Sequence, residues 1–322
     1  MKAISLFSGA GGDTLGMKNA GIDVVGYVEF DKAAIKTHSH NFPKCKLIGE
    51  DITKIPDETF LVYKNKINIM FGGFPCQSFS HCGKKNPTDK RGFLYQDFVR
   101  AARLIKPDII IGENVKGLLT RKTEDGELFL DVIIRDFENI GYIIKYKLFN
   151  MKNYGIPQSR ERILIYGISK DLIEKENITI NLENLEELTY KPTNRTISSF
   201  SLEKALQIED KKISDLIPDN KYIEEKNELL PTGTPSTNLI KCYNSGEFSF
   251  KTRAKSTYSC VIDLDDTSRT ILSSYGRMPR LFVPIKNNNG SFLRPYTISE
   301  LQQIQGFPKN FVFKGNYINQ EI

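Results

Sequence analysis

The sequence predicts an α/β fold, with a Rossmann-like, doubly wound sheet in the larger domain and a smaller inserted domain. Three observations support this prediction. The chain begins with a short apolar strand at 2–7, a glycine-rich turn at 8–13 and a helix at 14–20. Later apolar segments, such as 67–71 and 108–112, alternate with segments of helical periodicity. Chemically active side chains directly follow several of these segments, at the sheet edge where such folds bind ligands.

Length and composition limit the class of protein. A chain of 322 residues is long enough to bury a sizeable core, and its net charge of +6 admits an anionic partner. It contains no apolar run long enough to cross a bilayer, and its N-terminus lacks the apolar core of a signal peptide. Its five cysteines, at 45, 76, 82, 242 and 260, follow neither a disulfide framework nor a metal-ligand spacing. These features predict an intracellular protein with no membrane contact and no metal.

The turn after the first strand suits a ligand, because glycines let the backbone approach one closely. Gly9 and Gly11 lie in this turn, and Asp13 is a candidate N-cap for the helix that follows. A dinucleotide fingerprint would need a further glycine at position 14, where the chain has Thr14. The turn therefore disfavours NAD, and taken alone it is equally compatible with a plain tight connection.

The second and third predicted strands end in side chains that suit a nucleoside. Glu29 can accept hydrogen bonds from both ribose hydroxyls, and Phe30 can lie against an adenine face. Asp51 can accept a hydrogen bond from the adenine amino group. Asp31, beside them, is also a candidate N-cap for the next helix. An adenosine site without a pyrophosphate cradle predicts S-adenosyl-L-methionine as the cofactor.

Cys76 is the candidate nucleophile. It stands between Pro75 and Gln77, just after the apolar segment 67–71 and two glycines, and so at the ligand-binding edge of the sheet. Cysteine is the side chain that is most nucleophilic near neutral pH. The alternative is a buried structural cysteine, which is the commoner role of this residue type.

A polar, basic segment at 80–92 follows the cysteine and predicts a mobile loop. A loop of this length beside a nucleophile suggests a lid that closes over the substrate. Its Lys84, Lys85, Lys90 and Arg91 can meet phosphates, although the same composition also suits a merely solvated loop.

Two further motifs place charged groups beside strands. Glu113 directly follows the apolar segment 108–112, where a carboxyl group can bond to a ring nitrogen. Arg160 and Arg162 alternate before the apolar segment 163–167 and can hold a phosphate or a base carbonyl. The alternatives are a helix-capping role for the glutamate and a surface ion pair for the arginines.

In their order along the chain, these motifs resemble those of the DNA cytosine-5 methyltransferases. The resemblance covers residues 1–168 and 268–313, and its most specific parts are Pro-Cys-Gln at 75–77 and Glu-Asn-Val at 113–115. The other matching positions are 7–12, Glu29, Asp51, Gln158, Arg160, Arg162, Arg294, Thr297, Glu300 and the Gln-Gly-Phe-Pro run at 305–308.

The resemblance implies a Rossmann-like, S-adenosyl-L-methionine-dependent methyltransferase domain that flips a cytosine out of double-stranded DNA and methylates its carbon 5. It implies that the Cys76 thiolate adds to carbon 6 of the base and that Glu113 bonds to ring nitrogen 3. Arg162, with Arg160 nearby, would hold the cytosine carbonyl. The second product would be S-adenosyl-L-homocysteine.

Two sets of binding residues complete the prediction, and no residue is assigned to a metal. The cofactor is expected to contact Phe7, Gly9, Gly11, Leu15, Glu29, Phe30, Asp51, Ile52 and Pro75. The DNA is expected to contact Gln77, Ser80, Lys84, Lys85, Arg91, Arg253, Lys255 and Arg277.

Charge divides the chain in a way that agrees with an inserted recognition domain. Residues 1–168 carry a net charge of +6, residues 169–230 one of −5 and residues 231–322 one of +5. We expect a catalytic domain at 1–168, a target-recognition domain at 169–282 and a C-terminal segment at 283–322 that returns to the first domain. Because the acidic block repels phosphates, we expect the DNA-facing surface among the basic residues of 241–280.

The sequence departs from the family in one respect. A Gly-Asn-x-Val-Pro-like segment, usual near the end of the family's chains, is found neither before Ile322 nor at the N-terminus. We therefore expect a second subunit or a further C-terminal segment to complete the cofactor pocket, with Leu15 and Met17 of the first helix partly bare.

Two alternative functions stay open. One is a transfer-RNA cytosine-5 methyltransferase, and the other is a non-catalytic DNA-binding subunit that needs a partner chain. The main prediction is a restriction–modification methyltransferase that acts at DNA in the cytoplasm or nucleoid of a prokaryote, or in a virus-infected cell.

Overall fold

The computed structural model describes residues 1–75, 94–123, 125–177, 260–262, 267–273, 275, 280–287 and 290–315. Cys76 lies outside these residues, as do the predicted DNA contacts Gln77, Ser80, Lys84, Lys85, Arg91, Arg253, Lys255 and Arg277. The chain divides into two compact units, Met1–Phe149 with Glu161–Ala205, and Asn150–Arg160 with Leu206–Ile322. The predicted domain boundaries at 168 and 282 stay a prediction.

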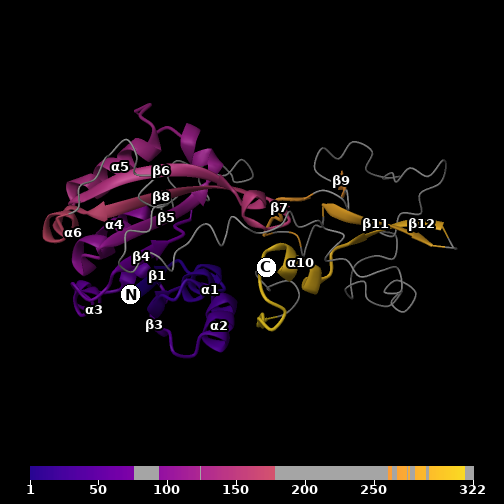
Figure 1. Cartoon of the computed structure of the whole chain (residues 1–322), viewed down its shortest axis with the longest axis horizontal. Coiled ribbons are helices and arrows are strands. Elements are labelled where there is room, and N and C mark those ends of the chain that lie inside the picture. The colour runs from indigo at the N-terminus through magenta and orange to yellow at the C-terminus, as the bar shows by residue number, and fades with distance from the viewer. Residues whose placement is uncertain are drawn as a thin grey trace. The chain divides into compact units, whose positions relative to one another are not determined.

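A seven-stranded sheet forms the centre of the first unit (Figure 1). Its strands are β1 (Lys2–Leu6), β2 (Asp23–Val28), β3 (Lys46–Gly49), β4 (Ile69–Gly72), β5 (Ile109–Val115), β6 (Tyr142–Asn150) and β8 (Glu161–Ser169), in the order β3-β2-β1-β4-β5-β8-β6. The first five strands are parallel, and β8 runs antiparallel to β5. The strand order changes direction between β1 and β4, which is where a sheet of this kind binds its ligand. The predicted α/β fold is confirmed.

Helices cover both faces of the sheet, because side chains along a strand point alternately to opposite sides. On one face, α3 (Asp57–Leu61), α4 (Leu94–Ile105) and α5 (Phe129–Asn139) share a hydrophobic core with Ile4 and Leu6 of β1. On the other, Ser5 bonds to Asp13 of α1 (Gly12–Asn19), and Tyr27 stacks on His38 of α2 (Lys32–Asn41) at 3.7 Å between ring centroids. None of the helices in the described ranges has the length and apolarity needed to span a membrane.

Two predictions for α1 are wrong. The N-cap is Gly11, which adopts φ 94°, in the left-handed region that favours glycine, and Asp13 makes no capping bond. The Asp13 side chain accepts a hydrogen bond from Ser5 instead. Met17 is 7% exposed and so is not bare, while Leu15 is half-buried. The sheet therefore already covers much of the helix face that was expected to need a partner.

Gly11 is also required by close packing, which gives a first testable prediction. A Cβ at this position would lie 2.6 Å from Cε2 of Phe42 and 2.8 Å from Cδ2 of His38. The added methyl group would collide with Phe42 and His38 and would also be strained by the positive φ. Because both effects destabilise the fold, we expect Gly11→Ala to lower the free energy of unfolding by about 2–4 kcal/mol.

Gly16 is the matched control, since it lies inside the same helix with nothing within 4 Å of an added Cβ. Gly16→Ala is expected to raise the free energy of unfolding by roughly 0.5–1 kcal/mol, because alanine is the better helix former. Urea unfolding followed by circular dichroism compares the two variants. An unchanged midpoint for Gly11→Ala would contradict the packing described here.

The second unit joins residues 150–160 to the C-terminal part of the chain. Strand β7 (Gln158–Ser159) pairs with β10 (Ser268–Arg269), and β9 (Cys260–Val261), β11 (Leu281–Asn287) and β12 (Gly290–Pro295) form a three-stranded sheet. Helix α10 (Ile298–Ile304) begins with a capping box, in which Thr297 and Glu300 each bond to the other's backbone N–H. Thr297 and Glu300 of the matching motif thus have a structural role at this helix start.

Two motifs that are distant in sequence interlock within the second unit. Gln158 is fully buried, and its Nε2 donates to Oε1 of Gln305 at 3.2 Å. A Cβ on Gly306, which follows Gln305, would collide with Ile156, which precedes Gln158 by two positions. Gln158, at the start of the Gln-x-Arg-x-Arg run, is therefore packed against the Gln-Gly-Phe-Pro run.

Candidate active site

The carboxyl ends of β1, β4 and β5 form the floor of the candidate site. The Gly73 N–H, just after β4, donates to the Leu6 carbonyl at 3.3 Å. A Cβ on Gly73 would lie 3.6 Å from Oε2 of Glu113 and 3.8 Å from the Phe7 carbonyl oxygen. Gly73 was not among the predicted site residues, yet it separates the predicted cofactor side from the predicted chemical side, and its lack of a side chain leaves the space between them open.

Glu113 and Arg162 form an ion pair beside this floor. The Nε atom of Arg162 lies 2.7 Å from Oε1 of Glu113, and the two side chains are 17% and 30% exposed. Antiparallel pairing of β5 with β8 brings them together, because it sets Val115 opposite Arg162. Arg160 belongs to the second unit, where its carbonyl accepts a hydrogen bond from Met151 at 2.9 Å. Two of the four predicted catalytic residues are thus in contact.

Asn114 lies in the matching Glu-Asn-Val motif but was not among the predicted site residues. Its side chain is 2% exposed, and its Nδ2 donates to the Phe74 carbonyl at 3.1 Å. Phe74 is itself buried in the core, and Pro75 after it is half-buried. The amide therefore anchors the chain two residues before Cys76. The available signal was a short amide side chain next to Glu113, a residue type that bonds readily to backbone groups.

Glu29 fixes the backbone on the predicted nucleoside side of the site through two hydrogen bonds. Its Oε2 accepts a hydrogen bond from the Gly9 N–H at 2.7 Å, and its Oε1 accepts one from the Asp31 N–H at 2.7 Å. A Cβ on Gly9 would meet nothing within 4 Å, so the turn leaves room above it. Phe30 is 72% exposed, and Asp31 caps α2 as predicted. Phe7 adopts φ 57°, a conformation uncommon for a residue other than glycine and concentrated at functional sites.

Asp51 has a capping role beside its predicted one. It precedes the short helix η1 (Ile52–Lys54), accepts a hydrogen bond from the Thr53 N–H at 3.1 Å and pairs with Lys54 at 3.1 Å. The hydrogen bond from the Thr53 side chain is the main reason that the pKa of Asp51 lies below its ordinary value. Ile52 is buried. An exposed aromatic ring, an open glycine turn and two fixed carboxylates together fit an adenosine-bearing cofactor.

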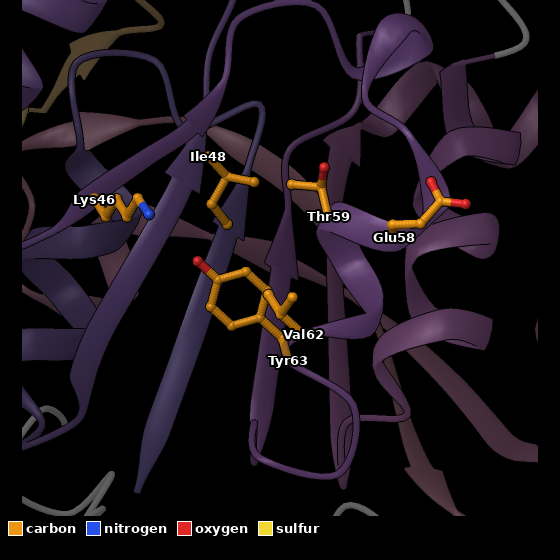
Figure 2. Close-up of a pocket in the computed structure, with 6 residues that line it drawn as sticks. All are labelled: Lys46, Ile48, Glu58, Thr59, Val62 and Tyr63. Atoms are coloured by element: carbon orange, nitrogen blue, oxygen red, sulfur yellow. The ribbon is translucent and has the colours of Figure 1, made fainter.

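A cavity of about 380 Å³ lies elsewhere in the first unit, between β3 and α3. Figure 2 shows Lys46 and Ile48 of β3 on one side, Glu58 and Thr59 of α3 on the other, and Tyr63 and Val62 below them. None of the predicted site residues lines it, so the cavity is not part of the candidate site. Within the described ranges, no cluster of histidine, cysteine or acidic side chains is arranged to hold a metal ion.

Comparison with known proteins places these features in a family. The family model described as C-5 cytosine-specific DNA methylase matches residues 1–321. The chain is 33% identical to the type II methyltransferase M.FnuDI of Fusobacterium nucleatum, over 97% of this chain and 86% of that protein. It is 31% identical to the type II methyltransferase M.Sau96I of Staphylococcus aureus, over 96% of this chain and 68% of that protein.

A solved structure supports the fold independently. The Dnmt2 methyltransferase of S. pombe superposes with a TM-score of 0.66 at 15% identity, covering all of this chain and 91% of that one. At this identity the likeness shows the fold alone.

Proposed function

Because the chain belongs to the family of C-5 cytosine-specific DNA methylases, we propose that Cys76, Glu113 and Arg162 carry its chemistry. The chain is a DNA cytosine-5 methyltransferase, and its family uses S-adenosyl-L-methionine. The observation that supports the proposal most is the 2.7 Å contact between Arg162 and Glu113, at strand ends beside the segment that leads into Cys76.

The proposed roles follow from what cytosine needs in order to react at carbon 5. The Cys76 thiolate adds to carbon 6, while the carboxyl group of Glu113 protonates ring nitrogen 3 or donates a hydrogen bond to it, which makes carbon 6 more electrophilic. Arg162 holds the carbonyl oxygen of the base and orients Glu113, with Arg160 nearby. When bound, S-adenosyl-L-methionine supplies the methyl group that the activated carbon 5 accepts. Loss of the carbon 5 proton and elimination of Cys76 then restore the aromatic ring.

We propose that the nucleoside part of the cofactor lies at the ends of β1 to β3. Phe30 is exposed and free to stack on adenine, and Glu29 is oriented by two backbone N–H groups with lone pairs left for ribose hydroxyls. Phe7, Gly9, Leu15, Asp51, Ile52 and Pro75 surround this region as the other proposed contacts. Gly11 contributes by backbone alone, since the space of its missing side chain is filled by Phe42.

Methylation of DNA is favoured over both alternative functions. The two relatives named above by sequence, M.FnuDI and M.Sau96I, are type II methyltransferases, which favours methylation of DNA over transfer RNA. The ion pair of Glu113 with Arg162 favours a catalytic chain over a non-catalytic subunit. We therefore propose that the chain methylates intracellular DNA as part of a restriction–modification system.

Expression in a host that lacks cytosine methylation tests the function. Single-base sequencing of the host genome for 5-methylcytosine is expected to find methylation at one short, recurring sequence, and none with Cys76→Ser. Methylation of transfer RNA without methylation of DNA would contradict the proposal in favour of the first alternative. Sequence-specific DNA binding with no methylation of either would favour the second.

Target recognition is proposed to rest on the basic residues of 241–280. Arginine is the commonest specific reader of guanine in the major groove, so Arg253→Ala or Arg277→Ala is expected to weaken binding. Loss of a base-reading arginine should cost about 1–3 kcal/mol of binding free energy at one position of the site. Loss of a phosphate contact should instead weaken binding about equally for all sequences and reduce its salt dependence. Fluorescence anisotropy with the cognate duplex and single-base variants measures both. Charge reversals within 169–230 that change affinity more than these losses would contradict this assignment.

A further inference from the structure

Arg100 of α4 binds the turn that carries Asp51 and Ile52. Its Nη2 donates a hydrogen bond to the Ile52 carbonyl at 2.7 Å, and its Nη1 donates one to the Ile55 carbonyl at 3.0 Å. These carbonyls belong to the first residue of η1 and to the residue directly after that helix. One guanidinium group therefore holds both ends of the turn on the proposed nucleoside side of the cofactor site.

The turn has little internal structure of its own. Helix η1 has three residues, and so short a helix is closed by few backbone hydrogen bonds. The Ile55 N–H donates to the Ile52 carbonyl at 3.4 Å, whereas Nη2 of Arg100 donates to the same oxygen at 2.7 Å. The shorter bond, from a charged donor, is the stronger one. The position of Ile52 is thus set more by Arg100 than by the turn itself.

Arg100 is itself held firmly. Helix α4 packs along one side into the hydrophobic core of the first unit. The guanidinium donates from Nε to Asp97 at 3.2 Å and from Nη1 to Asp57 at 2.7 Å, and it lies over the Phe60 ring at 5.5 Å. Because the donors of a guanidinium form a planar, rigid fork, these contacts fix its orientation toward the two carbonyls.

The charge of Arg100 also offsets a repulsion near the turn. Burial is the main cause that raises the pKa of Asp97, the Arg100 guanidinium opposes the rise, and the Asp51 carboxylate adds to it. Asp97 and Asp51 are thus close enough to repel each other, and the positive charge of Arg100 weakens this repulsion. Asp51, whose pKa lies below its ordinary value, is ionised at neutral pH and able to accept hydrogen bonds.

The Asp51 carboxylate keeps room for a further donor. Its Oδ1 accepts hydrogen bonds from the N–H and the hydroxyl of Thr53, and its Oδ2 pairs with Lys54, whose side chain is 80% exposed. Since each carboxylate oxygen can accept two hydrogen bonds, Oδ2 has a lone pair left for an amino group.

We propose that Arg100 is a positioning residue for the recognition of adenine. By holding the Ile52 carbonyl, it sets the turn so that Asp51, the preceding residue, meets the amino group of the base. The inference rests on the proposed function, in which Asp51 and Ile52 contact the cofactor. Arg100 acts through the backbone of the turn and does not itself contact the base.

Arg100→Lys tests the proposal, because lysine keeps the charge but cannot donate along both directions of the guanidinium fork. Calorimetry measures the affinity of each protein for S-adenosyl-L-homocysteine and for S-inosyl-L-homocysteine, in which a carbonyl replaces the amino group of adenine. We expect wild type to prefer the adenosine compound by roughly tenfold or more, as a hydrogen bond to a charged group allows. In Arg100→Lys this preference should fall at least about threefold. Groups that the two compounds share cancel in the ratio.

Asp57→Asn is the matched control. Asp57 accepts a hydrogen bond from the same Nη1 atom, but it belongs to α3 and its side chain is 45% exposed. This variant should keep the wild-type preference. Thermal unfolding of both variants supplies the second readout, since a role confined to joining α3 to α4 would lower the melting temperature of Arg100→Lys without changing its preference.

A preference that Arg100→Lys leaves at the wild-type value, or one that Asp57→Asn lowers as much, would overturn the proposal. Equal binding of both compounds by wild type would overturn it as well. If Arg100→Lys does not fold, Asp97→Ala, which removes the partner of Nε, takes its place with the same expected direction and the same contradicting result. Failure of wild type to bind S-adenosyl-L-homocysteine would instead overturn the proposed cofactor site, and the inference with it.

Discussion

Replacing Cys76 by serine is expected to lower the rate of methyl transfer by roughly a thousandfold or more, because a serine hydroxyl near neutral pH is a far weaker nucleophile than a thiolate. DNA binding should be retained, since the change is one atom. Transfer of a tritiated methyl group to a cognate duplex, measured in single turnover beside a binding assay, separates the two effects.

Cys45 provides the control for this substitution. It is a free, buried cysteine, and burial raises the pKa of its thiol to about 12, so it forms almost no thiolate at neutral pH. Cys45→Ala should therefore keep the wild-type rate per folded molecule. A Cys76→Ser variant that keeps the wild-type rate would show that another residue attacks the base.

Breaking the pair of Glu113 and Arg162 is expected to have the next largest effect. Glu113→Gln should lower the rate by about 100-fold to 10,000-fold, the range typical of a lost acid–base group. Arg162→Ala should lower the rate of methyl transfer by a similar factor. It removes the proposed contact with the base and the ion pair that holds Glu113, in which Nε of Arg162 lies 2.7 Å from Oε1 of Glu113. Since the two side chains act as one unit, the double variant should lose far less than the product of the two factors.

A neighbouring ion pair serves as the control for this comparison of single and double variants. Lys116 and Glu161 lie 2.9 Å apart, but their side chains are 58% and 40% exposed. Lys116→Ala should change the free energy of unfolding by less than about 1 kcal/mol and leave the rate nearly unchanged. Multiplicative effects of the Glu113 and Arg162 variants would contradict their action as a unit.

The order and type of most elements of the first unit could be predicted from the sequence, because apolar strands alternate with amphipathic helices there. The first strand at the N-terminus and the cap of α2 by Asp31 were predicted as the structure has them. The placement of Glu113 at a strand end was also predicted. Its contact with Arg162 was not, because it depends on β8 pairing antiparallel to β5.

The predictions that failed concerned side chains whose contacts depend on the packing of neighbouring elements. Asp13 has the residue type and position of an N-cap, but Gly11 forms the turn and leaves the carboxyl group to Ser5. Met17 could be placed only once the face of α1 that meets the sheet was known. Gly73 and Asn114 matter through contacts with other strands, at Phe7, Glu113 and Phe74, which no local pattern records.

Covalent trapping tests the central claim most directly. A duplex that carries 5-fluorocytosine at the target position cannot lose its carbon 5 substituent as a proton, so the enzyme stays attached after methyl transfer. The account predicts a stable adduct with wild type in the presence of S-adenosyl-L-methionine, mapped by mass spectrometry to the peptide containing Cys76, and none with Cys76→Ser. An adduct on another residue, or equal trapping by both proteins, would contradict it.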